Sequence, residues 1–209
     1  MLMKWRNSLI KRKALKYGVF EDIETVRRYD KETRKWMRNT SKTFVSMVKK
    51  WQMNENYVLD VGTATGRLAI EFSKKIPTLE VIGLDLAEVA LVVARENVQK
   101  SEIPLNISFK KGDAEDMPFE DSIFDLVISN NTLHLIKNPL KMFNEVHRVL
   151  KPTGRFIITD YKRSWLGIFW NHIRASYSLK EITDLLNQSN LQEWEVKESL
   201  LSLNIYSKV

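Results

Sequence analysis

The chain has 209 residues, with 33 Lys or Arg against 26 Asp or Glu, so its formal net charge is +7. This length suits one domain, or one domain with a short extension, and it is sufficient for a substantial core. Cysteine is absent, which excludes disulfides, thiolate metal centres and a cysteine nucleophile, and no apolar run approaches the ~20 residues of a membrane-spanning helix.

Positive charge is concentrated at the N-terminus. Residues 1–57 hold 15 basic and 6 acidic residues (+9), whereas residues 58–209 hold 18 and 20 (−2). We therefore expect residues 1–52 to form a basic helical extension and cap, and residues 53–209 to form the main domain. Such a block is usually a solvated helix face, but contact with nucleic acid or with an anionic membrane surface stays open as an alternative. No apolar signal peptide is present at the start, and we expect a cytoplasmic protein.

The first predicted element is a long helix over residues 22–51. Its apolar residues recur at near-helical spacing: Ile23, Val26, Tyr29, Trp36, Met37, Phe44, Met47 and Val48. A short apolar run at residues 57–61 then predicts a buried strand that leads into a glycine-bearing turn. A helix follows Gly66, and Pro77 is expected to stop it.

Strands and helices alternate through the middle of the chain. Further strands are expected at residues 80–85, 106–110, 124–129 and 155–160. Helices are expected at residues 88–100 and 139–150, the second beginning with a proline suited to a first helical turn. Residues 151–154 (KPTG) predict a turn between the second of these helices and the strand that follows it.

The C-terminal part predicts one more helix and two strands. Ser178 and Glu181 form a capping box at the start of the helix, and Asn190 is expected to end it in a left-handed conformation. Strand-like runs follow around residues 194–196 and 203–206. Alternation of this kind indicates the α/β class: a doubly wound, Rossmann-like, mostly parallel sheet with an antiparallel last strand, preceded by the N-terminal helical extension.

Ligands of such sheets bind at the carboxyl ends of the strands, so the residues there predict the site. Residues 60–66 (DVGTATG) form a glycine turn before a helix N-terminus, where a carboxylate or phosphate is favoured, and Asp60 adds a negative charge beside it. Taken alone, this motif is equally well explained as a helix-capping turn. Asp85 ends the second strand, where an acid can accept both hydroxyls of a ribose, and Asp113 ends the third, where it can meet a base. The three sites together predict a nucleoside that carries an amino-acid end.

Five motifs, read together, resemble the class I S-adenosylmethionine-dependent methyltransferases, in the group that includes quinone-biosynthesis and other small-molecule enzymes. They are residues 58–66 (VLDVGTATG), 83–86 (GLDL), 112–119 (GDAEDMPF), 124–129 (FDLVIS) and 145–155 (EVHRVLKPTGR). Residues 27–30 (RRYD) also resemble the family's N-terminal helix, which closes over the cofactor. Ala64 departs from the family's usual glycine, and Ala87 departs from its usual helix-capping serine.

The resemblance implies S-adenosylmethionine as the cofactor. The implied cofactor-binding residues are Tyr29, Asp60, Gly62, Thr63, Ala64, Gly66, Asp85, Leu86, Asp113, Ala114 and Asn130. Tyr29 is expected to cover the sulfonium, where a ring favours a cation. A nicotinamide or flavin enzyme is disfavoured, because its G-x-G-x-x-G/A pattern would place Gly at Ala64 and Gly or Ala at Arg67.

The expected reaction is methyl transfer to a small molecule by in-line displacement without a metal. The three histidines lie in separate segments, so no metal site is expected, and His134 is a candidate general base, although local packing is the commoner role for such a residue. Tyr161 ends the fifth strand on the expected substrate side. Trp165, Phe169 and Ile173 share a helical stripe that predicts either core or a lid over an apolar substrate.

Two other functions remain open at this point. One is a nucleic-acid methyltransferase of the ribose or ring-nitrogen type that uses the basic N-terminal segment. It is disfavoured because residues 129–132 (SNNT) lack the Asn/Asp-Pro-Pro-aromatic motif of enzymes that methylate base amines, and because 209 residues leave no room for an RNA-binding module. The other is a protein that binds the cofactor without catalysis. Neither the acceptor nor the oligomeric state can be predicted from the sequence.

Overall fold

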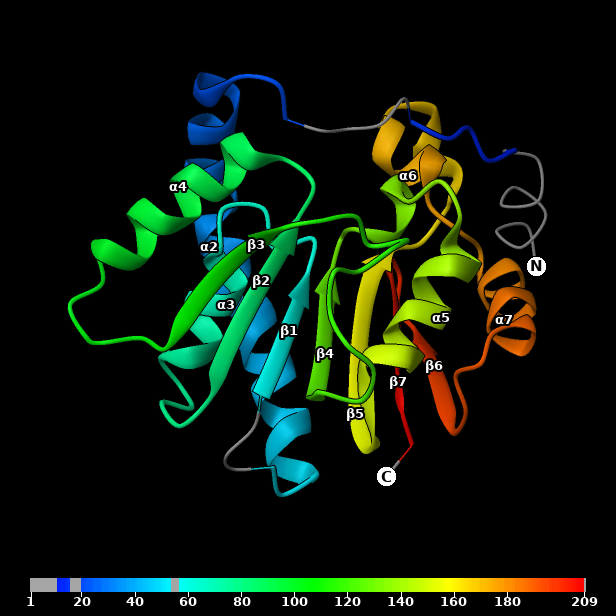
Figure 1. The fold of residues 1–209 in the computed structure, drawn as a ribbon. Coiled ribbons are helices and arrows are strands. Elements are labelled where there is room, and N and C mark those ends of the chain that lie inside the picture. The colour runs from blue at the N-terminus through cyan, green and yellow to red at the C-terminus, as the bar shows by residue number, and fades with distance from the viewer. Residues whose placement is uncertain (1–10, 16–19, 54–56, 209) are drawn as a thin grey trace.

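The computed structural model describes residues 11–15, 20–53 and 57–208. Seven strands form one sheet in the order β3-β2-β1-β4-β5-β7-β6 (Figure 1). The strands are β1 (Tyr57–Val61), β2 (Glu80–Asp85), β3 (Ile107–Lys111), β4 (Phe124–Asn130), β5 (Leu150–Tyr161), β6 (Trp194–Glu198) and β7 (Ser202–Ser207). The first five strands pair in parallel, whereas β7 runs antiparallel to both β5 and β6, which confirms the predicted doubly wound α/β class.

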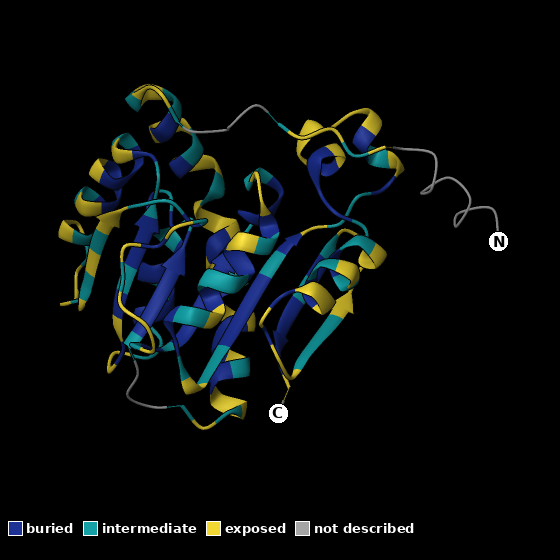
Figure 2. Ribbon diagram, turned by 45° about the vertical axis from the view of Figure 1, so that its right-hand side comes forward, coloured by how far each residue is buried: buried dark blue, intermediate teal, exposed yellow. Residues whose placement is uncertain are grey.

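Helices cover both faces of the sheet. They are α2 (Ile23–Lys50), α3 (Arg67–Ser73), α4 (Glu88–Gln99), α5 (Pro139–Val149), α6 (Asn171–Ala175) and α7 (Leu179–Gln188), with short 3-10 helices η1 (Leu133–Leu135) and η2 (Trp165–Ile168). Because side chains alternate along a strand, β1 serves two cores: Leu59 packs with α5 and α7, and Val58 packs with α2 and α3. Buried residues follow the central strands, whereas the edge strands β3 and β6 and the outward sides of the helices carry exposed residues (Figure 2). None of the helices in the described ranges combines the length and the apolarity that crossing a membrane requires.

The caps at the helix starts agree with the sequence. Asp22 caps α2 by accepting a hydrogen bond from the backbone of Thr25, and Ser178 and Glu181 form the predicted capping box of α7. Ala87 precedes α4 without any side-chain cap. The long helix, α2, therefore begins and ends within one residue of its predicted limits.

Several boundaries differ from the prediction. Helix α3 ends at Ser73 rather than at Pro77, because the N–H of Lys75 donates to the oxygen of Phe72, three residues back, and the regular pattern is broken there. The predicted turn at residues 151–154 is instead part of β5, where it forms an irregularity opposite Phe124 that shifts the register to β4. Asn190 does not stop α7 in a left-handed conformation: Ser189 is the cap in an extended conformation, and the Asn190 N–H donates to Asn144.

The apolar stripe expected after β5 does not exist. The segment splits into η2 and α6, so Ile173 is buried while 70% of Phe169 is exposed. Trp36 is also not a core residue, because 72% of it is exposed. In both places the apolar spacing is helical, but the neighbouring elements leave one side uncovered.

Candidate functional site

A cavity of about 930 Å³ opens at the carboxyl ends of the parallel strands, beside α2. Ten of the residues singled out in the sequence line it: Tyr29, Gly62, Ala64, Asp85, Leu86, Asp113, Ala114, Asn130, His134 and Tyr161. A small adjoining recess of about 20 Å³ adds Asp60 and Thr63. The strand ends therefore bring together residues that are up to 132 positions apart in the chain.

The glycine turn is shaped by close packing. The backbone of Gly62 has φ +73°, and a Cβ at this position would lie 2.1 Å from the Oγ1 atom of Thr132, so no larger residue fits. Ala64 also has a positive φ, +48°, and its N–H donates to Oδ2 of Asp85 at 2.8 Å. Gly66 lies outside both cavity linings; its φ is +70°, and a Cβ there would meet the ring of Phe109. Gly66 thus shapes the turn from behind.

Asp60 lies at the closed end of the site. Only 1% of the residue is exposed, and Oδ2 accepts a hydrogen bond from the hydroxyl of Thr63 at 2.7 Å. Burial raises the pKa of Asp60 to about 7, against the lowering effect of that hydrogen bond. Asp60 can therefore exist in either protonation state near neutral pH, and a cation in the recess would favour the charged state.

Asp85 is held by backbone donors on both oxygens. Oδ1 accepts from the N–H of Ala87 at 2.9 Å, and Oδ2 accepts from the N–H of Ala64. Burial raises the pKa of Asp85, although these N–H donors oppose the shift. Each carboxylate oxygen keeps a further lone pair, so Asp85 can also accept hydrogen bonds from hydroxyls in the cavity. Asp113 lines the cavity beside Ala114, and its Oδ1 accepts from the N–H of Glu115 at 2.9 Å.

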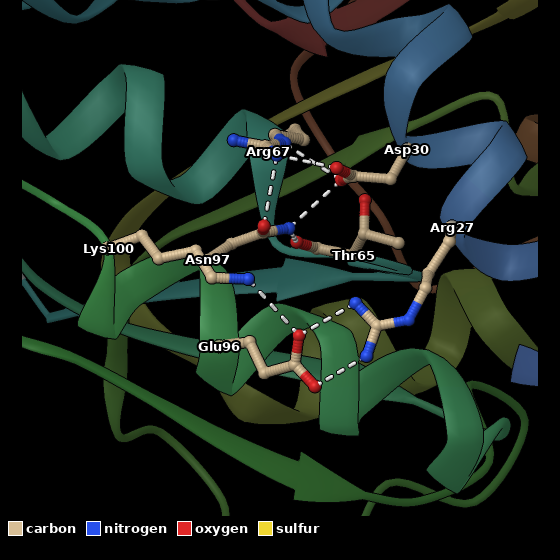
Figure 3. A network of polar contacts seen from close by, with 7 residues as sticks. All are labelled: Arg27, Asp30, Thr65, Arg67, Glu96, Asn97 and Lys100. Atoms are coloured by element: carbon tan, nitrogen blue, oxygen red, sulfur yellow. Dashed lines mark hydrogen bonds and ion pairs between the residues drawn. The ribbon is translucent and has the colours of Figure 1, made fainter.

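Helix α2 is fixed to the glycine turn by a buried polar network (Figure 3). Arg67 Nε donates to Oδ1 of Asp30 at 2.8 Å, and Arg67 Nη2 donates to Oδ1 of Asn97 at 2.9 Å. Asn97 Nδ2 in turn donates to Asp30 and to the backbone oxygen of Thr65. Burial alone would raise the pKa of Asp30, but the hydrogen bonds from Arg67, Thr65 and Asn97 outweigh it and lower that pKa.

The same helix carries Tyr29 over the cavity. The Phe20 ring packs against the Tyr29 ring with centroids 5.0 Å apart. Burial, with the nearby carboxylates, raises the pKa of Tyr29 to about 12, so the phenol keeps its proton at neutral pH. The α2 network therefore holds a neutral aromatic ring above the glycine turn.

A second polar cluster, which includes the lining residues His134 and His172, lies at the same cavity. The Nδ1 atom of His134 lies 2.7 Å from Oδ1 of Asp160, and its Nε2 atom lies 3.0 Å from Nδ1 of His172. The three histidines were expected to lie apart, but the fold brings two of them into contact. Within the described part of the chain, no three His, Cys, Asp or Glu side chains are grouped so that they could hold a metal ion.

Two of the sequence-predicted acceptor residues lie elsewhere. Trp165 and Phe169 do not line the cavity, and their rings contact each other with centroids 6.4 Å apart. Sequence reasoning missed other lining residues on α2, β5, α6 and β7: Trp36, Met37, Asn39, Thr40, Thr43, Phe44, Thr159, His172, Leu201, Ser202 and Asn204. The position of Thr159 near the end of a strand could have indicated it. The α2 residues were interpreted as core, because helical periodicity does not show whether an apolar face packs against the sheet or lines a cavity.

The chain was compared with known protein families and proteins. A family model described as a methyltransferase domain matches residues 52–201. An uncharacterized methyltransferase, YcgJ of Bacillus subtilis, is 32% identical over 144 residues, which cover 68% of this chain and 54% of that protein. The ubiquinone/menaquinone biosynthesis C-methyltransferase UbiE of Pseudomonas entomophila is 35% identical over 109 residues, or 52% of this chain and 43% of that protein.

A solved structure extends the comparison to a ligand. The Haemonchus contortus phosphoethanolamine N-methyltransferase 2, in complex with S-adenosyl-L-methionine, superposes with a TM-score of 0.59 and 28% identity, over 69% of this chain and 35% of that chain. The chain spans about half the length of the curated relatives that it matches. The matched region contains the glycine turn and the strand-end acids described above.

Proposed function

The chain belongs to the methyltransferase domain family, and on this premise we propose that it transfers a methyl group from S-adenosylmethionine to a small-molecule acceptor by in-line displacement. When bound, S-adenosylmethionine supplies a methyl group made electrophilic by its positive sulfonium. The protein's own task is then to bind, align and exclude water.

The residues present fit this cofactor. The cradle at Gly62 is one that a Cβ would fill, and it adjoins the buried Asp60, whose charge suits the ammonium of a methionine end. Asp85 is oriented by two N–H donors and can accept both hydroxyls of a ribose. Asp113 and Ala114 would meet the adenine, while Tyr29 and Asn130 would flank the methyl group. The proposal rests mainly on one observation, that all of these residues line one cavity and its recess.

The acceptor end of the cavity favours an apolar or aromatic molecule. Trp36, Met37 and Phe44 of α2 line it together with Leu201, and hydroxyl or amide groups from β5 and β7 lie among them. The UbiE relative is a C-methyltransferase of ubiquinone and menaquinone biosynthesis, which supports an acceptor with a quinone-like ring. Because this chain covers only 54% of the YcgJ relative, the identity of the acceptor is proposed from the cavity lining.

A labelled-methyl experiment separates the alternatives. The protein is incubated with S-adenosylmethionine that carries a radioactive methyl group, and with either a small-molecule extract of the source cells or total RNA. We expect label in the small-molecule fraction only, loss of that label with Asp85→Ala, and its retention with Asp184→Ala, whose side chain pairs with Lys180 in α7.

Two outcomes would contradict the proposal. Label found only in RNA would favour the nucleic-acid enzyme. No label in either fraction, together with normal cofactor binding, would favour a non-catalytic binder.

We also propose that the exposed apolar residues 168–170, at the end of η2, contact an anionic membrane surface. Ile168, Phe169 and Trp170 are exposed by 69%, 70% and 55%, and basic residues 11–13 lie beside them because the Arg12 guanidinium donates to the backbone oxygen of Ala175. Aromatic and cationic groups side by side suit a lipid interface. Residues 1–10, which hold the rest of this basic stretch, lie outside the described residues. We expect the protein to sediment with phosphatidylglycerol vesicles but not with phosphatidylcholine vesicles. Sedimentation with neither kind of vesicle, or to the same extent with both, would contradict the proposal.

A further inference from the structure

Asp160, His134 and His172 form an unbroken chain of polar contacts. Asp160, the last residue but one of β5, is 3% exposed, and His134 in η1 is 2% exposed. Oδ2 of Asp160 accepts the backbone N–H of His134 at 2.7 Å, while Oδ1 meets Nδ1 of the same residue at 2.7 Å. Two contacts to one carboxylate fix both the backbone and the ring of His134.

The chain ends in the cavity. The Nδ1 atom of His172 lies 3.0 Å from Nε2 of His134, and the two ring planes are nearly perpendicular, at 87°. Because Nδ1 is engaged, Nε2 is the ring nitrogen of His172 that remains for another partner. His172 and His134 both line the cavity, together with Tyr161. The relay therefore leads from a buried carboxylate to the acceptor end of the site.

The carboxylate also determines which nitrogen carries each proton. An ionised carboxylate only accepts hydrogen bonds, so Nδ1 of His134 must donate to Asp160. In neutral His134 the other nitrogen, Nε2, then has a lone pair, and it must accept from Nδ1 of His172. Neutral His172 consequently has its own lone pair on Nε2.

We propose that His172 Nε2 takes the proton from a hydroxyl-bearing acceptor, phenolic in character, and that His134 and Asp160 are positioning residues that orient His172 for this step. The inference rests on the proposed methyl transfer and narrows its substrate class. A thioether or tertiary amine has no proton to lose and would have no use for such a group.

Methyl transfer to a hydroxyl oxygen requires the loss of its proton. The acceptor's O–H bond breaks, its proton joins Nε2 of His172, and the electron pair stays on oxygen. That pair forms the oxygen–carbon bond to the methyl group while the carbon–sulfur bond of the donor breaks, its pair remaining on sulfur. The imidazolium that results keeps its Nδ1–H bond to His134, and the Asp160 carboxylate stabilises the added charge. Solvent takes the proton after product release.

The surroundings suit this role at neutral pH. Burial and the neighbouring His134 lower the pKa of His172, against the opposing charge of Asp160, so the lone pair is available. Tyr161 packs edge-on against His134, and burial raises the pKa of that phenol, which keeps it neutral. Basic residues 11–13 contact the last turn of α6 and add positive charge, whereas η2, which packs against α6, contains no titratable side chain.

A chromogenic phenol tests the relay without methyl transfer. The probe is 4-nitrophenol, whose ionised form is yellow, added with saturating S-adenosylhomocysteine at a pH below the probe's own pKa in water. We expect a larger yellow fraction for the bound probe than for the free probe at the same pH, because the imidazolium of His172 and the phenolate formed by proton transfer stabilise each other. His172→Gln should lower the bound phenolate-to-phenol ratio by about tenfold or more, a factor equal to one unit of pKa. His147→Gln, in an exposed position of α5, is the matched control and should behave as wild type.

The results that contradict the proposal are separate from those that contradict the proposed function. A probe that binds in calorimetry yet stays colourless would overturn it, as would equal ionisation by His172→Gln. A probe that fails to bind, while S-adenosylmethionine still binds, would refute the phenolic acceptor and leave the cofactor site standing. Independently, ¹⁵N NMR of the wild type should show the proton of His172 on Nδ1; a proton on Nε2 would also refute the relay.

Discussion

Asp60 is buried where its charge is unfavourable and where the ammonium of a bound cofactor would require that charge. At Asp85 two backbone N–H groups oppose this effect, although burial still raises its pKa. Both acids were predictable from their places at the ends of short apolar strands. The role of His172 was not, because its contact with His134 joins residues 38 positions apart through an irregular segment.

Asp60→Asn should raise the stability of the folded protein and weaken its binding of S-adenosylmethionine. In the folded protein the pKa of Asp60 is about 7 against an ordinary 3.8, so between these values the folded state holds a proton that the unfolded state has lost. Wild-type stability should therefore fall as pH rises through this window, and the Asn variant should not share that loss. Above pH 7 we expect the variant to be more stable by on the order of 1–3 kcal/mol.

The same variant should bind S-adenosylmethionine more weakly and without the wild-type pH dependence. Wild-type affinity should rise with pH up to about 7 as Asp60 ionises, since the ammonium favours the charged form. Urea unfolding and calorimetry at several pH values measure both effects. A variant that is less stable than the wild type above pH 7 would contradict this prediction, because it would mean that the charge of Asp60 stabilises the folded protein.

At the scale of elements, α2 is the part whose placement decides the site. Its periodicity predicted the helix and its length, and the structure adds Asp22 as the cap at its start. Periodicity could not predict that Trp36 stays exposed or that Met37 and Phe44 line the cavity, because this depends on where α2 crosses the strand ends. The prediction of a single helical stripe between β5 and α7 was wrong for a related reason: the apolar spacing there is helical, yet the segment forms two short helices, η2 and α6.

Two of the ion pairs that join α2 to neighbouring elements allow a matched comparison. Asp30→Asn should remove the charge that Arg67 meets in the buried network, lower stability by about 1–3 kcal/mol and weaken cofactor binding by loosening Tyr29. Arg27→Ala removes the exposed pair with Glu96, which also joins α2 to α4, and should change neither property measurably.

Thermal unfolding and calorimetry of the two variants provide the measurements. Equal losses in both variants would mean that the buried network has no special part in positioning α2. Loss of stability with unchanged cofactor affinity in Asp30→Asn would separate the network from the site.

At the scale of the whole molecule, the order β3-β2-β1-β4-β5-β7-β6 explains why distant residues meet. Parallel strands end at one edge, so the acids after β1, β2 and β3 converge, and right-handed crossovers make this arrangement predictable from alternating strands and helices. The antiparallel placement of β7 between β5 and β6 brings Leu201, Ser202 and Asn204 to the acceptor end. Their approach depends on the pairing of the last strands, which local sequence patterns do not specify.

This edge of the sheet is proposed to bind adenosine joined to methionine. Calorimetric titration of the purified, folded chain with S-adenosylmethionine tests it most directly. We predict saturable binding at a single site, weakened by about 1–3 kcal/mol in Asp85→Ala, because the hydroxyls of the ribose would lose their buried partner. No heat of binding at millimolar cofactor, or full affinity in Asp85→Ala, would contradict the account.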